Sequence, residues 1–152
     1  VDFDLDANIS LLNGAGKLTS DTSFVFYNNT QDATGSVKHC GDNRRGAGDG
    51  HDETAEINLA TLPTEVETIR FAVTIHEADA RRQNFGMVRN AFIEVMEAGS
   101  NKSVVRYDLS EDFSVETCVV VGELYKNNGD WKFKAVGAGF SGGLDSYVAS
   151  IQ

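Results

Sequence analysis

The segment from Gly41 to Glu53 gathers oxygen ligands in a stretch that four glycines leave free to bend. Its candidate ligands are four carboxylates and one side-chain amide: Asp42, Asn43, Asp49, Asp52 and Glu53. A calcium ion takes about six to eight oxygens at roughly 2.3–2.6 Å, and backbone carbonyls join them where the chain turns tightly. The spacing does not fit an EF-hand, because Arg44 would occupy the third loop position. The composition indicates a calcium loop of another architecture, with an acidic solvated turn as the alternative.

A second acidic element lies at the start of the chain. Residues 3–11 alternate between apolar and polar side chains, which predicts a strand. Asp4 and Asp6 fall on its polar face, together with Asn8 and Ser10, and the two aspartate backbones are about 6.6 Å apart along such a strand. Two carboxylates at this spacing can converge on one ion or serve two neighbouring ions. A solvent-facing or edge strand that carries charge against aggregation is the other interpretation.

Strands and tight turns must position these acidic elements, and the rest of the pattern supplies them. The turn at Asn13–Lys17 returns the first strand toward Phe24–Tyr27, and Asn127–Asp130 has the composition of a hairpin turn. The predicted elements are strands at Val119–Tyr125, Trp131–Val136 and Ile69–Ile75, a hairpin of Val88–Met96 with Val104–Tyr107, and a short helix at Leu144–Ile151. The first arm of the Val88 hairpin also fits a helical period. The glycines of Gly137–Gly142 are expected to shape a turn after the last strand, because the chain ends too soon for a dinucleotide-binding unit.

Composition narrows the classes of partner and compartment. The chain has 152 residues and no proline- or serine-rich linker, which favours one globular domain. Its formal net charge is −10 and its thirteen Lys and Arg residues are scattered, which disfavours nucleic acid and anionic membranes as partners. No apolar run is long enough to cross a bilayer. Cys40 and Cys118 lie far apart and outside any paired-cysteine motif, so we expect a reducing, cytoplasmic location.

Motifs typical of one domain family run almost from end to end of the chain. They are Asp4–Asp6, Phe24–Asn29, Gly41–Glu53, Arg70–Ile75, Gln83–Gly86, Arg106–Asp112, Gly122–Tyr125 and Trp131–Gly137. In these motifs the chain resembles the TerD family of tellurium-resistance and stress-response domains. The resemblance implies one TerD-like domain over residues 1–152, folded as a mainly β protein. The expected fold is a β-sandwich of two packed, largely antiparallel sheets with short helices, and the expected activity is calcium binding rather than catalysis.

Two positions and one end of the chain depart from the family pattern. His51 stands where the family usually has a carboxylate, and Arg45 stands where a threonine is usual. Neutral imidazole is a poor calcium ligand, so we expect one of the family's two ion sites to be weakened. Family members usually carry a further stretch with a Gly-Trp-Asp element before the first acidic strand. We therefore expect this chain to lack the N-terminal strand region of its domain.

Together these observations predict a calcium-binding stress-response module. One or two Ca²⁺ ions would be held by Asp4, Asp6, Asp42, Asn43, Asp49, Asp52 and Glu53. The expected partners are other proteins of a stress or tellurite-resistance system, with neither nucleic acid nor insertion into a membrane. The alternative is a metal-dependent hydrolase whose ion activates water, although only His51 suggests itself as a base. An ion that keeps exchangeable water at a cleft would favour the hydrolase, and an ion fully wrapped by protein oxygens would favour the binding module.

Overall fold

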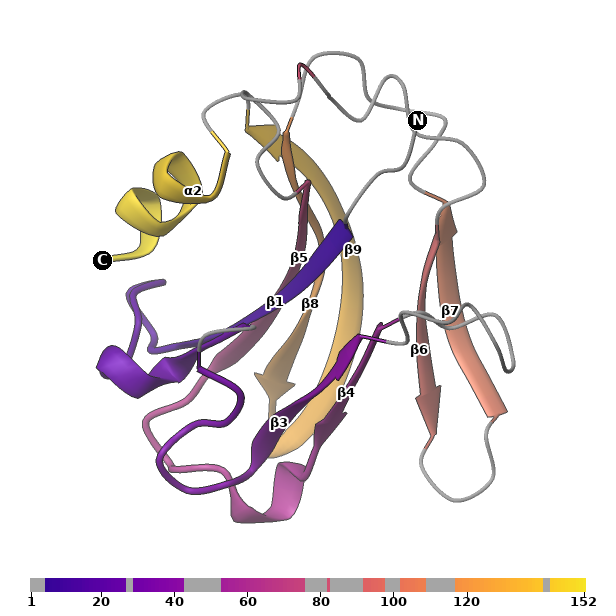
Figure 1. The fold of residues 1–152 in the computed structure, drawn as a ribbon. Coiled ribbons are helices and arrows are strands. Elements are labelled where there is room, and N and C mark those ends of the chain that lie inside the picture. The colour runs from indigo at the N-terminus through magenta and orange to yellow at the C-terminus, as the bar shows by residue number, and fades with distance from the viewer. Residues whose placement is uncertain are drawn as a thin grey trace.

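A five-stranded antiparallel sheet forms the centre of the molecule (Figure 1). The computed structural model describes residues 5–26, 29–42, 53–75, 82, 92–97, 102–108, 117–140 and 143–152. The sheet has the order β2-β1-β5-β8-β9. Its strands are β1 (Leu5–Leu12), β2 (Phe24–Val25), β5 (Thr68–Ile75), β8 (Cys118–Asn127) and β9 (Asp130–Phe140).

Two further antiparallel pairs and three short helices complete the described elements. β3 (Val37–Asp42) pairs with β4 (Glu53–Ile57), and β6 (Phe92–Glu97) pairs with β7 (Lys102–Asp108). The 3₁₀ helices η1 (Asp21–Ser23) and η2 (Leu59–Thr61) lie between strands, and α2 (Gly143–Ile151) follows β9. Every described strand pair is antiparallel and helix is scarce, so the expected mainly β class is confirmed.

Both faces of the central sheet are covered. Successive side chains of a strand point to opposite faces, and these strands carry apolar side chains on both. One core layer, which the β3–β4 hairpin covers, contains Ile9, Leu11, Val25, Val37, Val66, Ile69 and Phe71, with Ala55, Ile57, Trp131 and Phe133 packed against it. The other layer, which α2 covers, contains Leu12, Phe24, Ala72, Cys118, Val120, Tyr147 and Ile151. The β3–β4 hairpin and α2 therefore lie on opposite faces of one sheet (Figure 1).

The polar face of β1 does not point to water where its side chains are described. Asn8 is 1% exposed and Ser10 is fully buried, because β1 lies inside the sheet and its face meets α2. Asn8 donates a hydrogen bond to Thr74 Oγ1 at 3.4 Å. The alternation of residues 5–11 is thus confirmed as a strand, and the solvent-facing interpretation of its polar side is wrong at Asn8 and Ser10.

The β8–β9 hairpin is confirmed, with a two-residue turn at its tip. Asn128 and Gly129 both have positive φ, 53° and 86°, which is the type I′ geometry that matches the twist of two antiparallel strands. β9 runs to Phe140, so the expectation of a turn directly after Val136 is wrong. Gly137, at φ 68°, lies where β9 has one more residue than β8, and a glycine in that conformation forms a bulge without ending the strand.

The other predicted elements agree with the structure within the described residues, except that the strand predicted at Phe24–Tyr27 ends at Val25 and Phe26 forms an isolated bridge with Asn29. β5 and α2 occupy the expected ranges to within one residue, and β2 returns beside β1 after the turn at Asn13–Lys17. The hairpin of β6 with β7 is confirmed, whereas residues 88–91 of its predicted first arm lie outside the described residues.

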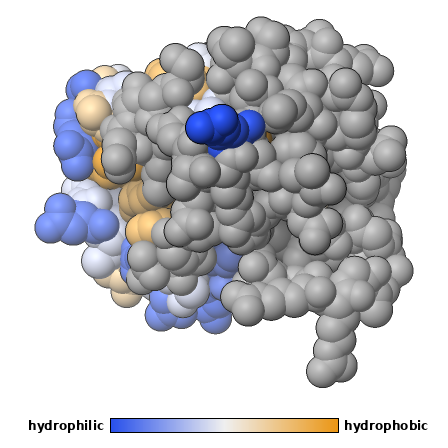
Figure 2. Space-filling view, turned by 45° about the horizontal axis from the view of Figure 1, so that its top comes forward, coloured by the Kyte–Doolittle hydropathy of each residue, from blue (hydrophilic) through white to orange (hydrophobic). Residues whose placement is uncertain are grey.

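The described surface mixes hydrophobic and hydrophilic side chains. On the face shown in Figure 2, a hydrophobic group at the left is flanked by hydrophilic residues. Leu59 and Val136 are the exposed large hydrophobic residues of the described ranges. None of the helices within those ranges has the length and apolar character needed to cross a membrane.

Candidate functional site

The β3–β4 hairpin brings the two ends of the acidic loop together. Asp42 ends β3 and Glu53 begins β4, and the two residues are direct partners in the antiparallel pairing. Opposed Cα atoms in such a pair are about 4.5–5.5 Å apart, so Asp42 and Glu53, at the two ends of the connecting segment, are close neighbours. The register shifts between His39 and Asp42, which marks an irregularity just before the loop. The strand frame of the predicted calcium loop is therefore in place.

The first strand starts at the same end of the molecule. Asp6 lies in β1, paired with Thr74, and β1 contacts β4. Asp6 is the second residue of β1 and Glu53 is the first residue of β4, and both strands run downward in Figure 1. The described residues Asp6 and Glu53 thus lie on two strands that contact each other.

Four of the seven predicted ligands lie outside the described residues. Asp4, Asn43, Asp49 and Asp52, together with His51 and Arg45, lie outside the described residues, and Asp6, Asp42 and Glu53 are described by their backbones alone. Within the described ranges, no group of three or more His, Cys, Asp or Glu side chains is placed to hold a metal. The fit of calcium therefore depends on the oxygen donors of the loop and on the hairpin that closes it.

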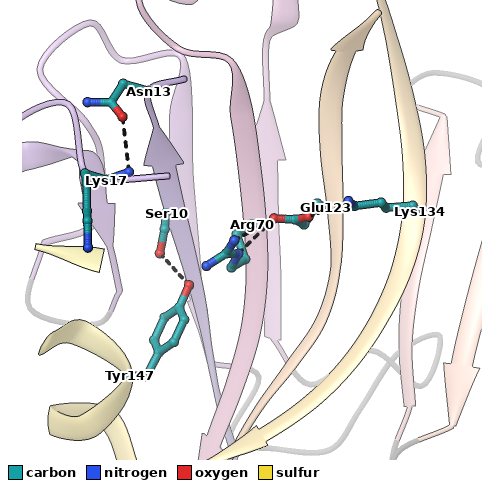
Figure 3. Close-up of polar contacts among 7 residues, drawn as sticks. All are labelled: Ser10, Asn13, Lys17, Arg70, Glu123, Lys134 and Tyr147. Carbon is teal, nitrogen blue, oxygen red and sulfur yellow. Dashed lines mark hydrogen bonds and ion pairs between the residues drawn. The ribbon is translucent and has the colours of Figure 1, made fainter. Parts of the chain in front are cut away.

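A second cluster, which the sequence analysis did not select, crosses three strands on the α2 side of the sheet. The Glu123 carboxylate, in a residue only 7% exposed, lies between Arg70 of β5 and Lys134 of β9 (Figure 3). Arg70 Nε donates a hydrogen bond to Glu123 Oε2 at 2.9 Å, and Arg70 Nη2 forms an ion pair with the same oxygen at 2.9 Å. Lys134 Nζ is 3.4 Å from Oε1. A buried carboxylate is tolerated when it is paired in this way.

Tyr147 continues the polar contacts from the sheet to α2. Its hydroxyl lies 3.0 Å from Ser10 Oγ, and both residues are fully buried (Figure 3). Burial raises the pKa of Tyr147, while the hydrogen bond with Ser10 and the charge of nearby Arg70 act in the opposite direction. The hydroxyl therefore stays protonated and holds α2 against β1.

An open groove of about 620 Å³ lies above the Arg70–Glu123–Lys134 cluster. One wall is the turn after β1, which Asn13 fixes by accepting hydrogen bonds from the amides of Ala15 and Lys17 at 2.9 and 3.2 Å. The remaining lining comes from residues before and within β5, β8 and β9, and includes Glu65, Glu67, Thr68, Tyr125 and Lys126. The sequence signal for this site is the alternation of Thr68, Arg70 and Ala72 on one strand face, but only the register reveals that Glu123 is opposite Arg70.

Comparison with known proteins adds to this geometry. The family model described as the TerD domain matches residues 1–150. The chain belongs to the TerD family. It is 54% identical to tellurium resistance protein TerD of Serratia marcescens over 148 residues, which cover 97% of this chain and 77% of the relative. It is 51% identical to general stress protein 16U of Bacillus subtilis (strain 168) over 143 residues, 94% of this chain and 74% of the relative.

A solved structure shows the same TerD fold. The crystal structure of a homologue of telluride resistance protein (TerD) from Streptomyces coelicolor A3(2) superposes with a TM-score of 0.79 at 20% sequence identity. The match covers 97% of this chain and 85% of the other. This similarity supports the arrangement of the strands, and at that identity it concerns the fold alone.

Proposed function

We propose that this TerD-family protein is a calcium-binding module of the stress response, including tellurium resistance, and that it acts through protein partners. The relatives are named as resistance or stress proteins rather than as enzymes, which supports a non-catalytic role. The net charge of −10 favours cations over nucleic acid as ligands. The partners we propose are other proteins of the same stress or tellurite-resistance system, in the cytoplasm.

The pairing of Asp42 with Glu53 carries the calcium proposal. It joins the two ends of the segment whose sequence also contains Asn43, Asp49 and Asp52, and the five residues together supply oxygen donors. With Asp4 and Asp6, the acidic elements have a net charge of −4, and that repulsion is relieved by a bound divalent cation. Calcium suits this donor set because it accepts many oxygens in a flexible geometry, whereas magnesium requires a stricter octahedron.

Titration of the metal-stripped protein with calcium tests the proposal. Free calcium at a hundredfold above the dissociation constant should stabilise the fold by about 2.7 kcal/mol, and magnesium should stabilise it less. Calorimetry gives the affinity, and thermal unfolding with and without chelator gives the stabilisation. A melting temperature that is indifferent to millimolar calcium and to chelator would contradict the assignment.

Two substitutions locate the site. Asp52→Asn and Asp4→Asn should each weaken calcium binding, and their effects should be non-additive because both residues serve one cluster. Asp130→Asn is the matched control, because Asp130 is an exposed aspartate in the β8–β9 hairpin. Simple addition of the two losses would point to separate sites, and an equal loss in the control would point to a general effect of charge.

A further inference from the structure

The groove on the α2 side of the sheet has exposed carboxylates at its rim. Glu65 and Glu67 line it, both are exposed, and neither carboxylate forms an ion pair or a side-chain hydrogen bond with another described residue. A Cβ added at Gly14 would lie 3.9 Å from Glu67 Cγ, which places the Glu67 side chain beside the turn after β1. Lys126 also lines the groove and donates a hydrogen bond to the Thr64 carbonyl at 3.2 Å, so this end carries two carboxylates against one ammonium, a net charge of −1.

The floor of the groove carries the opposite charge. Arg70 and Lys134 share the single carboxylate of Glu123, so the cluster has an excess of one positive charge. The Lys134 side chain is 58% exposed and the Arg70 side chain 26%, whereas that of Glu123 is 9% exposed. The Lys134 ammonium also lies 5.7 Å from the centre of the Tyr125 ring. Within this cluster, the side chains exposed to the groove are therefore mainly the two cations, Arg70 and Lys134.

The two ends of the groove select for a ligand with both charges. A simple anion would be repelled by Glu65, by Glu67 and by the net charge of −10, and a simple cation would be repelled by Arg70 and Lys134. We propose that the groove binds a small zwitterion, whose ammonium group meets Glu65 and Glu67 and whose carboxylate meets Lys134 and Arg70. This ligand carries no net charge, so the acidity of the protein does not oppose its approach.

The dimensions suit a ligand whose charges are several bonds apart. The backbones of Glu67 and Arg70 are three residues apart in an extended segment, a span of about 10 Å. A volume of about 620 Å³ falls within the range of roughly 300–1,000 Å³ that is usual for small-molecule sites. An ω-amino acid spans the two charged ends better than an α-amino acid, whose ammonium and carboxylate are adjacent.

A chain-length-matched set of probes tests the proposal by nuclear magnetic resonance titration of the ¹⁵N-labelled protein. The zwitterion 6-aminohexanoate should produce saturable shifts of the amides of Gly14, Glu67 and Glu123. Hexanoate and hexylammonium, which each keep one charge, should bind at least tenfold more weakly. Saturable binding of either single-charge probe with the affinity of 6-aminohexanoate, or no saturable shift with 6-aminohexanoate, would overturn the proposal.

Two exposed positions provide the matching variants. Glu67→Gln and Lys134→Gln should each weaken 6-aminohexanoate binding at least tenfold, and Glu123 remains paired with Arg70 in the second variant. Lys132→Gln is the control, because Lys132 is an exposed lysine two residues from Lys134 on the same strand and does not line the groove. Circular dichroism confirms that each variant is folded. Equal affinity in Lys134→Gln and Lys132→Gln would place the ligand elsewhere.

Discussion

Glu123 shows how one residue can organise three strands. Its carboxylate forms an ion pair with a cation from each neighbouring strand, Arg70 of β5 and Lys134 of β9. Its backbone pairs with both strands. The two cations are not equivalent, because Arg70 makes two contacts of 2.9 Å while the more exposed Lys134 makes one of 3.4 Å. The arginine is therefore the partner that compensates the buried charge.

This difference predicts an order of stabilities. Arg70→Gln should lower the free energy of unfolding by about 3 kcal/mol, because it leaves a buried carboxylate poorly compensated. Lys134→Gln should lower it by less than about 1 kcal/mol, as is usual for an exposed ion pair. Urea unfolding at neutral pH measures both, with Lys132→Gln as the reference. A larger loss in Lys134→Gln than in Arg70→Gln would show that the lysine is the main partner.

Asp32 is a second buried carboxylate, and its hydrogen bonds predict a pH dependence. Burial alone would raise the pKa of Asp32, but hydrogen bonds from Thr34 Oγ1 at 2.6 Å and from the Val37 amide at 3.0 Å outweigh it and lower the pKa. The unfolded state therefore binds the proton more tightly than the folded state. The stabilisation is present above the ordinary value of 3.8 and is lost as the pH falls through the lower folded pKa.

The variant Asp32→Asn tests this linkage. It should cost about 1–2 kcal/mol at pH 7, because a charge-assisted acceptor becomes a neutral one. Below pH 4 its stability should fall less steeply with acidity than that of the parent chain, which urea unfolding over a pH series measures. Parallel curves for the two proteins over that range would contradict the lowered pKa.

At the scale of elements, the buried hydrogen bond between Tyr147 and Ser10 holds α2 to the sheet together with apolar contacts. Tyr147→Phe removes the hydroxyl and leaves Ser10 buried without that partner, so we expect a loss of about 1–3 kcal/mol. The double variant Tyr147→Phe with Ser10→Ala should lose less than the sum of the single variants. Thermal unfolding of the parent chain, the two single variants and the double variant measures this double-mutant cycle. Strict additivity would mean that the two hydroxyls do not interact.

The elements also show how far the sequence predicts this molecule. Alternation and turn residues located β1, β5, the β8–β9 hairpin and α2, because these signals are local. The continuation of β9 beyond Val136 was missed, because glycine signals a turn and a bulge equally well. The calcium loop stays a prediction from composition, because residues 43–52 lie outside the described residues. The Arg70–Glu123–Lys134 cluster was not predicted, since it depends on a register between strands far apart in the sequence.

At the scale of the whole molecule, Cys118 reports on opening of the core. It is fully buried in the core layer beneath α2, and burial raises the pKa of its thiol to about 12. The reactive thiolate is thus depleted about a thousandfold relative to an ordinary cysteine. In a Cys40→Ser variant, iodoacetamide should label the folded protein at pH 8 far more slowly than the urea-unfolded protein. Similar rates in the two states would place the thiol at the surface.

The strand order β2-β1-β5-β8-β9 has a consequence for how the chain folds. The β8–β9 hairpin closes through two residues, so the entropy of loop closure is small and the hairpin can form early. The β1–β5 pairing, by contrast, joins segments far apart in the sequence, from Leu5 with Ile75 to Leu12 with Thr68. The larger entropy of closing this long loop must be lost before these contacts form. We therefore expect refolding in milliseconds to seconds, the range of β topologies with high contact order, with β1 and its partner β2 joining the sheet last.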